Sequence, residues 1–326
     1  MISVGLVGAG FANNAHADVL MQEDNVRISG VVDPDPRRAA ALAHKTGAAV
    51  EASLEALLEK GTDAIYIASP NALHAQMTLT ALSAGLHVFS EKPMATTLAD
   101  ARRVWETTSQ AKGIYQLGFN RRFAPVYRTL KGFIEEGHLT PRWAHVKMNR
   151  GELQNPPWVA DASLSGGFLY ESAIHLLDIC RWLFGEAREV ICRAGQGCYD
   201  QLDGFAMLIS FASGVTASLC SCAHTTWLFP FERLEVFGDH CTAVTEEMER
   251  LTHCPGLGKP AETQDFWQLP MTEKRGYLEE DRLFLRAVRH GDPPAVSAED
   301  GYRAVELVEA CYRAAQTGDP VLLPLQ

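Results

Sequence analysis

Two short segments of the chain carry side chains that could transfer a proton or stabilise charge during catalysis. In Glu91-Lys92-Pro93, the Lys92 ammonium could hydrogen-bond a substrate hydroxyl and stabilise negative charge on its oxygen. Further along, a helix would bring Glu171, His175 and Asp178 to one face, because they are spaced four and three residues apart. A carboxylate one turn from an imidazole can fix its tautomer and raise its basicity, which suits a general base. Each segment also has a structural interpretation: a solvated lysine before a turn, and a helix histidine held by an ion pair.

The first ten residues supply a candidate cofactor site. The apolar run Ile2–Val7 predicts a strand that leads into the turn Gly8-Ala9-Gly10 and then into a helix. Such a turn presents backbone N–H groups and a helix N-terminus to a pyrophosphate. Gly8 is needed for the backbone angles of the turn, and Gly10 keeps side chains away from the phosphates. Asn13 replaces the third glycine of the usual fingerprint, so we expect the first helix to start differently or to lie farther from the strand.

Asp33 indicates which dinucleotide is bound. It follows the apolar run 28–32, where a carboxylate can accept hydrogen bonds from both hydroxyls of an adenosine ribose. This favours NAD, because the carboxylate would repel a 2′-phosphate. Arg37 and Arg38 follow on the next predicted helix and could attract that phosphate, so NADP stays an alternative.

The elements that must hold these residues alternate between strand and helix in the first half of the chain. The predicted strands are 2–7, 26–32, 64–68, 86–89 and 114–118, and the predicted helices are 11–21, 37–45, 53–59, 72–84 and 98–111. The strands are apolar throughout, which is typical of a doubly wound parallel sheet covered on both faces. The sequence therefore predicts an α/β protein whose residues 1–119 form an N-terminal Rossmann domain.

The second half changes character and predicts a C-terminal α/β domain at 120–326 with an open, largely antiparallel sheet. Helices are expected at 125–136, 167–184, 277–289 and 298–316, and strands at 144–149, 189–194, 205–211, 215–222 and 234–237. The later strands follow one another without helices, which predicts antiparallel pairing. Residues 252–275 are rich in proline and glycine and give no clear element. The segment Phe205–Phe211 is apolar at nearly every position, so we expect its second face to be covered, by another subunit in preference to a loop. A homodimer or homotetramer formed through this sheet is therefore predicted.

Composition excludes several classes of protein. The chain of 326 residues has a formal net charge of −11 and no basic block, which argues against nucleic acid and anionic membrane surfaces. No apolar run reaches the length of a membrane span and no signal peptide is evident, so cytoplasm is the expected compartment. All eight cysteines lie beyond residue 179 without a C-x-x-C pair. We therefore expect small buried thiols, with Cys220 and Cys222 on one strand face, and neither a metal site nor disulfides.

Several motifs, in order along the chain, resemble the Gfo/Idh/MocA family of oxidoreductases. They are Gly8-Ala9-Gly10, 68–74 (Ala-Ser-Pro-Asn-Ala-Leu-His), Glu91-Lys92-Pro93, 118–123 (Gly-Phe-Asn-Arg-Arg-Phe), Gly166-Gly167 with His175 and Asp178, and 296–300 (Val-Ser-Ala-Glu-Asp). The resemblance covers essentially the whole chain. It implies NAD(P)-dependent redox chemistry on sugars, cyclitols or similar polyols, with Lys92 and His175 as catalytic residues. Glu171 stands where the family usually has aspartate, and 224–231 does not resemble the inositol dehydrogenase branch.

These observations predict a dehydrogenase in which His175 takes the proton of a secondary hydroxyl while hydride passes to the nicotinamide. Glu171 would support His175, and Lys92 would position the hydroxyl. The residues expected to bind the cofactor are Gly8, Gly10, Phe11, Ala12, Asp33, Arg38, Ser69, Pro70, Asn71, His74, Glu91, Lys92 and Asn120. The residues expected to contact the substrate are Arg122, Trp158 and His224. Two alternatives stay open: a non-catalytic NAD(P)-binding regulator, and an enzyme that cleaves glycosides by transient oxidation with a tightly held NAD.

Overall fold

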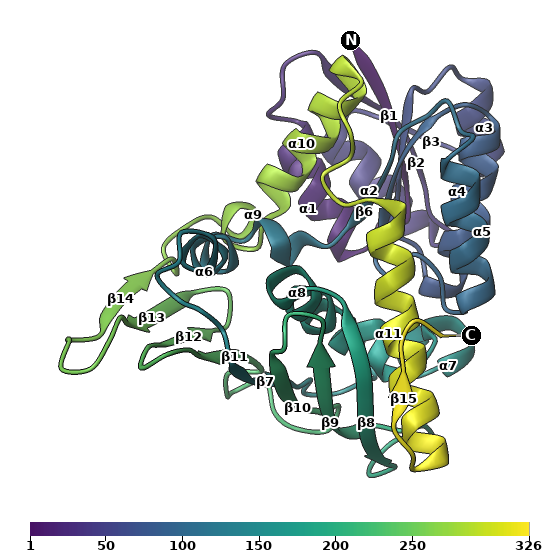
Figure 1. The fold of residues 1–326 in the computed structure, drawn as a ribbon. Helices are drawn as coiled ribbons and strands as arrows, with labels where there is room; N and C mark the ends of the chain where they lie inside the picture. Colours follow the sequence, from purple (N-terminus) through teal and green to yellow (C-terminus); the bar gives the residue numbers. More distant parts are fainter. Residues whose placement is uncertain (326) are drawn as a thin grey trace. The chain divides into compact units, whose positions relative to one another are not determined.

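The computed structural model describes residues 1–325. The chain forms two compact units (Figure 1). The first unit contains Met1–Phe119 and Tyr277–Arg303, and the second contains Asn120–Gly276 and the chain from Ala304 onward. The change of unit at residue 119 coincides with the expected one, whereas Tyr277–Arg303 lies in the first unit and not in the second, where the sequence had assigned it.

The first unit is built on a six-stranded parallel sheet in the order β3-β2-β1-β4-β5-β6. Its strands are β1 (Ile2–Val7), β2 (Val26–Val32), β3 (Ala49–Val50), β4 (Ala64–Ile67), β5 (His87–Glu91) and β6 (Tyr115–Gly118). Its helices are α1 (Phe11–Leu20), α2 (Pro36–Thr46), α3 (Leu54–Glu59), α4 (His74–Ser83) after the 3-10 turn η1 (Asn71–Leu73), α5 (Leu98–Thr108), α10 (Tyr277–His290) and the start of α11 (Ala298–Thr317). The predicted doubly wound parallel sheet is confirmed. Only the two-residue strand β3 was missed.

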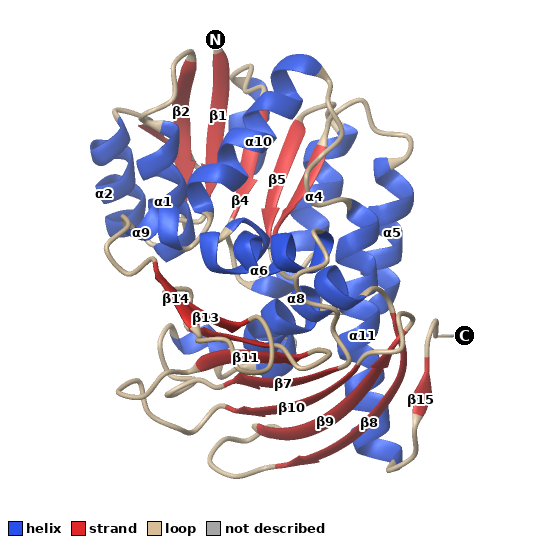
Figure 2. Cartoon of the chain, turned by 60° about the vertical axis from the view of Figure 1, so that its left-hand side comes forward, coloured by secondary structure: helices blue, strands red, loops and turns tan. Residues whose placement is uncertain are grey.

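Helices cover both faces of this sheet (Figure 2). On one face, Leu20 of α1, Leu42 of α2 and Phe284 of α10 share a core with Leu6 and Phe89 of the sheet. On the other face, α4 packs against β5 and α5. The place of α10 explains why Tyr277–Arg303 belongs to this unit: its apolar stripe completes a core that the N-terminal residues leave open.

The second unit contains a nine-stranded sheet in the order β14-β13-β12-β11-β7-β10-β9-β8-β15. Its strands are β7 (Trp143–Met148), β8 (Ala187–Gly195), β9 (Gly204–Phe211), β10 (Thr216–Cys222), β11 (Glu232–Phe237), β12 (Thr242–Glu246), β13 (Arg250–Cys254), β14 (Glu262–Asp265) and β15 (Val321–Leu322). The helical segments are η2 (Asn120–Phe123), α6 (Pro125–Glu135), η3 (Pro157–Val159), α7 (Ala162–Ser165), the π-turn η4 (Leu169–Ala173), α8 (Ile174–Phe184), α9 (Met271–Lys274) and the rest of α11. Only β7 and β10 pair in parallel, so the largely antiparallel sheet is confirmed. The stretch 252–275, which gave no clear element, contains most of β13, with β14 and α9.

One face of this second sheet packs against helices, and α6 contacts β12 and β13 (Figure 2). On β9, Phe205, Met207 and Ile209 are buried while Ala206 and Leu208 are exposed. Within this chain, β9 therefore alternates between a buried and an exposed face, although its sequence is apolar at nearly every position. Of the eight cysteines, four are buried and the others are partly or fully exposed, so the expectation of uniformly buried thiols was wrong. No disulfide joins them, and none of the helices within residues 1–325 is both long and apolar enough to cross a membrane.

Candidate functional site

The carboxyl edge of the parallel sheet collects most of the residues expected to bind the cofactor. The glycine turn follows β1, Asp33 follows β2, Ser69-Pro70-Asn71 follows β4, and Lys92 follows β5. Strands β1 and β4 are neighbours from which the chain order runs in opposite directions. Ligands of doubly wound sheets bind at such a switch point, beyond the carboxyl ends of the strands.

The glycine turn is open where a pyrophosphate would lie. Gly8 has φ +91°, and a Cβ there would stand 2.3 Å from the carbonyl oxygen of Ala68. A Cβ on Gly10 would meet nothing within 4 Å, and no side chain caps α1, which begins at Phe11 and Ala12. Uncapped N–H groups at a helix N-terminus are the donors that a phosphate accepts from. This turn therefore fits a dinucleotide.

Asn13 has a specific role in place of the third glycine. Its side chain is fully buried, and its amide Nδ2 donates to the carbonyl oxygens of Val7 at 3.0 Å and Gly8 at 2.7 Å. The amide thus joins the first turn of α1 to the end of β1, adding a second donor to the Val7 carbonyl, which also accepts the N–H of Ala68.

Asp33 is nearly buried and already fixed. Its Oδ2 accepts a hydrogen bond from the backbone N–H of Ala9 at 2.7 Å, while Oδ1 accepts from the N–H of Asp35 at 2.8 Å. The Arg38 guanidinium donates to the same Oδ1 at 3.0 and 3.2 Å. A carboxylate has about four lone-pair positions, so Oδ2 keeps one for a ribose hydroxyl. Asp33 therefore connects the glycine turn to the end of β2.

The loops that follow β4 and β5 are joined by His74. This buried imidazole places Nε2 2.8 Å from the carbonyl oxygen of Ser69 and Nδ1 2.8 Å from that of Pro93. Burial lowers the pKa of His74 while the two carbonyl acceptors raise it, and only the protonated ring can donate to both of them. The position of His74 is that of a brace between the two loops. Its predicted contact with the cofactor stays a prediction.

A histidine that was not predicted as a site residue, His16, binds the side chain of Glu91 next to Lys92. His16 of α1 is fully buried, with Nδ1 2.8 Å from Oδ1 of Asp281 on α10 and Nε2 3.3 Å from Oε1 of Glu91. Burial alone would lower the pKa of His16, but the two carboxylates raise it to about 10. The ring is therefore an imidazolium at neutral pH, and it donates from both nitrogens.

This imidazolium fixes the start of the Glu-Lys-Pro segment. Burial would raise the pKa of Glu91, but the hydrogen bond and charge of His16 hold it below its usual range. The other oxygen of Glu91, Oε2, accepts the backbone N–H of Lys92 at 3.1 Å. Lys92 itself is partly exposed between the buried residues Glu91 and Pro93.

In the second unit, His175 lies in the first turn of α8. Within the stretch 171–180 it is the one residue that is partly exposed, while its neighbours are buried. The expected helix is confirmed from Ile174 onward, but Leu169–Ala173 forms a π-turn. A π-turn adds a residue to the helical repeat and is frequent at functional sites. The prediction that Glu171 and His175 share one face stays a prediction, because residues four apart lie about one turn apart in either helical repeat.

Glu171 is bound by an arginine that the sequence analysis did not single out. The Nη1 of Arg150 donates to both carboxylate oxygens of Glu171 at 2.8 Å, and Ser172 donates to Oε2. The Arg150 guanidinium also lies over the ring of Trp227, 5.7 Å from its centroid. Arg150 thus connects the π-turn to the loop between β10 and β11. The support of His175 by Glu171 stays a prediction.

The side chains of the segment Asn120–Phe123 are buried, and its polar side chains bind other residues of the second unit. Arg122 donates to Asp178 from Nε at 2.7 Å and from Nη2 at 2.6 Å, and Arg121 pairs with Glu232 at 2.7 Å. Asn120 donates to the carbonyl oxygen of Arg275 at 2.9 Å. These contacts give Asp178 two arginine partners, Arg122 and Arg181, in the interior of the second unit. Arg121 and Arg122 therefore hold buried structural contacts, and substrate contact by Arg122 and cofactor contact by Asn120 stay predictions.

The last two predicted substrate contacts lie in loops of the second unit. Trp158 is partly exposed in the 3-10 turn η3. His224 follows β10, with Nδ1 3.6 Å from Oδ2 of Asp203. Neither prediction is tested by this geometry.

A parallel sheet in this order, with an open glycine turn at its switch point, defines a dinucleotide-binding unit. Comparisons with known proteins agree with it. The profile described as the oxidoreductase family with NAD-binding Rossmann fold matches residues 2–119, and the profile of that family's C-terminal alpha/beta domain matches residues 131–323. The chain belongs to this Gfo/Idh/MocA oxidoreductase family, and the predicted NAD-dependent oxidoreductase is confirmed.

Individual relatives are more distant. The chain is 27% identical to myo-inositol 2-dehydrogenase of Thermotoga maritima over 321 residues, which cover 95% of each chain. It is 28% identical to inositol 2-dehydrogenase of Rhizobium meliloti, with 96% of each chain covered. Among solved structures, levoglucosan dehydrogenase in complex with NADH superimposes with a TM-score of 0.90 over the full length of both chains at 22% identity. That structural likeness confirms the fold.

Proposed function

We propose that the protein is an NAD-dependent dehydrogenase that oxidises a secondary hydroxyl of a sugar or cyclitol. The single observation that carries the proposal is that His175 alone is partly exposed in an otherwise buried stretch, on the first turn of α8. The names of the relatives, inositol 2-dehydrogenases among them, support a polyhydroxylated substrate.

Each half of the proposed chemistry has its own residue. His175 accepts the hydroxyl proton as the alkoxide forms. Lys92, with its backbone anchored by Glu91, donates a hydrogen bond to the same oxygen and stabilises its negative charge. When bound, NAD supplies the acceptor for the hydride that leaves the carbon. Glu171, held by Arg150, is proposed to orient His175.

The residues proposed to hold NAD belong to the first unit. The N–H groups of Phe11 and Ala12 face the pyrophosphate, and Gly10 leaves room for it. The free lone pair on Oδ2 of Asp33 accepts from the adenosine ribose. Arg38 donates to Asp33, which favours NAD over NADP because the guanidinium charge is already paired.

The first experiment follows nicotinamide absorbance during incubation with NAD or NADP and a panel of sugars and cyclitols. Reduction with one class of compound identifies both the cofactor and the substrate. With that substrate, His175→Ala should lower turnover by about 10²–10⁴, the usual size of general acid–base catalysis, without loss of NAD binding. The matched control is His138→Ala, an exposed histidine that should leave turnover unchanged. Wild-type turnover in His175→Ala would remove His175 from the mechanism, and full activity in Lys92→Ala would remove Lys92.

The same experiment separates the alternatives. A regulator would bind NAD but reduce none of it with any compound. An enzyme that works by transient oxidation would retain NAD through purification and release sugar from glycosides without net reduction.

We also propose a homo-oligomer formed through the open sheet face. Trp143, Leu208 and Phe237 project from this face and are 59%, 40% and 37% exposed, which is unusual for large apolar side chains in one area. Light scattering should give a mass of at least two chains for the wild type, and Leu208→Glu should lower it. A monomeric wild type would contradict the proposal. The cytoplasmic location stays a prediction.

A further inference from the structure

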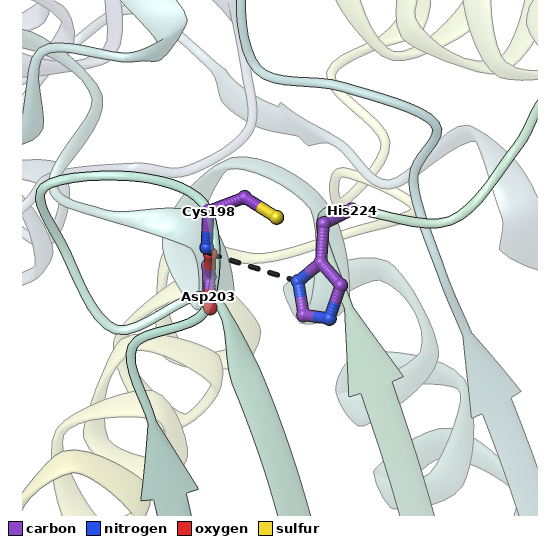
Figure 3. A group of neighbouring side chains, drawn as sticks. All are labelled: Cys198, Asp203 and His224. Carbon is purple, nitrogen blue, oxygen red and sulfur yellow. Dashed lines mark hydrogen bonds and ion pairs between the residues drawn. The ribbon is translucent and has the colours of Figure 1, made fainter.

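A second cluster of polar side chains lies at the end of the antiparallel sheet, formed by two loops. Cys198 and Asp203 come from the loop between β8 and β9, and His224 comes from the loop that follows β10 (Figure 3). One potential ligand atom from each residue lies within 4.8 Å of the other two. No metal-binding motif indicates this cluster, because Cys198 and Asp203 lie far from His224 along the chain.

Asp203 is the fixed member of the cluster. Its carboxylate is fully buried and accepts the backbone N–H groups of Gly197 at 2.7 Å, Cys198 at 2.6 Å and Tyr199 at 3.0 Å. The Gly197 N–H is the only one of the three directed at Oδ1, so this oxygen keeps a lone pair. The three consecutive N–H groups of the turn 197–199 therefore all bind the Asp203 carboxylate and fix its position.

The spacing between Asp203 and His224 does not suit a hydrogen bond. Nδ1 of His224 is 3.6 Å from Oδ2 of Asp203, beyond the usual limit of about 3.2 Å. Two nitrogen or oxygen ligands of one tetrahedral ion, each about 2.0–2.2 Å from it, lie about 3.3–3.6 Å apart. Oδ2 stands at this separation from His224 but already accepts two N–H groups, so Oδ1, which keeps a lone pair, is the oxygen available to a cation.

A glycine keeps the space between these two groups open. A Cβ on Gly197 would lie 3.2 Å from Oδ1 of Asp203 and 3.2 Å from Cε1 of the His224 ring. The Cys198 side chain is exposed and directed toward His224 (Figure 3). Its Sγ lies within 4.8 Å of a potential ligand atom of Asp203 and of His224.

We propose that Cys198, Asp203 and His224 form a binding site for a thiophilic divalent cation of the zinc type. Sulfur, nitrogen and one carboxylate oxygen are the donor set that zinc selects, whereas magnesium and calcium prefer oxygen alone. A water molecule completes the tetrahedron. The site joins two loops of the second unit, and its test below measures metal binding without any readout of dehydrogenase activity. A bound ion there would stabilise the fold by linkage.

The test uses the intact, chelator-treated protein and zinc in competition with a chromophoric chelator. The wild type should bind one tight equivalent per chain, and Cys198→Ser and His224→Ala should each weaken that equivalent by at least about tenfold. Matched controls are Cys254→Ser and His138→Ala, which change a thiol and an imidazole outside the cluster and should retain it. Asp203 is left unchanged because its substitution would release the turn 197–199.

Cobalt provides a readout that a structural role would not give. Co²⁺ bound at this site should show a thiolate-to-metal charge-transfer band that Cys198→Ser abolishes and Cys254→Ser keeps. The proposal is overturned if the wild type binds zinc no more tightly than the Cys198→Ser/His224→Ala double variant. It is equally overturned if the cobalt protein lacks the thiolate band.

Discussion

The buried contact between His16, Asp281 and Glu91 makes a sharp prediction about stability. The pKa of His16 rises from 6.5 to about 10, which corresponds to roughly 5 kcal/mol for the proton on the ring. Burying the three charged groups offsets part of this free energy. Removal of one partner from a buried ion pair destabilises a protein by about 3–5 kcal/mol. His16→Gln removes the charge but keeps an amide donor for one carboxylate. We therefore expect it to lower the free energy of unfolding by about 3 kcal/mol at pH 6.5.

The dependence of this loss on pH follows from the direction of the shift. The pKa of His16 is about 10 in the folded protein and 6.5 in the unfolded chain. The protonated ring therefore contributes its full stabilisation below pH 6.5, and this contribution decreases as the pH rises toward 10. The difference in unfolding free energy between the wild type and His16→Gln should therefore shrink steadily from pH 6.5 to pH 9.5. Urea unfolding at several pH values measures it. The difference between the two proteins cancels distant groups, whereas Glu91 and Asp281 lose the imidazolium that lowers their pKa, so their titration is part of the measured difference.

His44 provides the matched control, because it is an exposed histidine on α2 of the same unit. His44→Gln should change the unfolding free energy by less than about 0.5 kcal/mol at any pH. Nitrogen NMR of the His16 ring at pH 7.5 tests the charge directly, since both ring nitrogens should carry protons. A neutral ring, or a stability difference that does not vary with pH, would refute this account of the contact.

Three further changes test other parts of the structure. Gly8→Ala forces a Cβ to 2.3 Å from the Ala68 carbonyl and should cost about 1–3 kcal/mol of stability, whereas Gly10→Ala meets open space and should leave the melting temperature unchanged. Equal melting temperatures for the two variants would contradict the role given to Gly8. Asp33→Ser should narrow the preference for NAD over NADP. The measurement is the ratio of kcat/KM with NAD to kcat/KM with NADP, because Asp33 also binds the N–H of Ala9 and its loss can lower both values. An unchanged ratio would exclude the ribose contact. Arg122→Gln should destabilise the second unit by about 3–5 kcal/mol because it leaves Asp178 buried with one weaker partner, and a loss below 1 kcal/mol in urea unfolding would show that the pair is not structural.

The sequence predicted well those parts of the fold that local pattern determines. Apolar runs located β1, β2 and β4 to within a residue or two, and the glycine turn and Asp33 followed from their place at strand ends. Chain order could not show that α10 packs on the first unit, because its core partners lie within the first 89 residues of the chain. The π-turn before His175 was also out of reach, since its sequence reads as ordinary helix.

The partners of the functional residues were the hardest to predict, although one of them left a signal. On α10, Tyr277, Asp281, Phe284 and Leu285 follow one helical stripe, and all four are buried. A carboxylate within an apolar stripe requires a buried cation or donor, because burying an unpaired charge is too costly to persist. His16 occupies the equivalent position on α1, between Asn13 and Leu20 on its buried face. A buried acidic residue on one helix and a buried basic residue on another predict that the two helices pack together, as Asp281 and His16 do. Polar residues within an apolar helix face therefore indicate contacts between distant parts of the chain, which apolar periodicity alone does not.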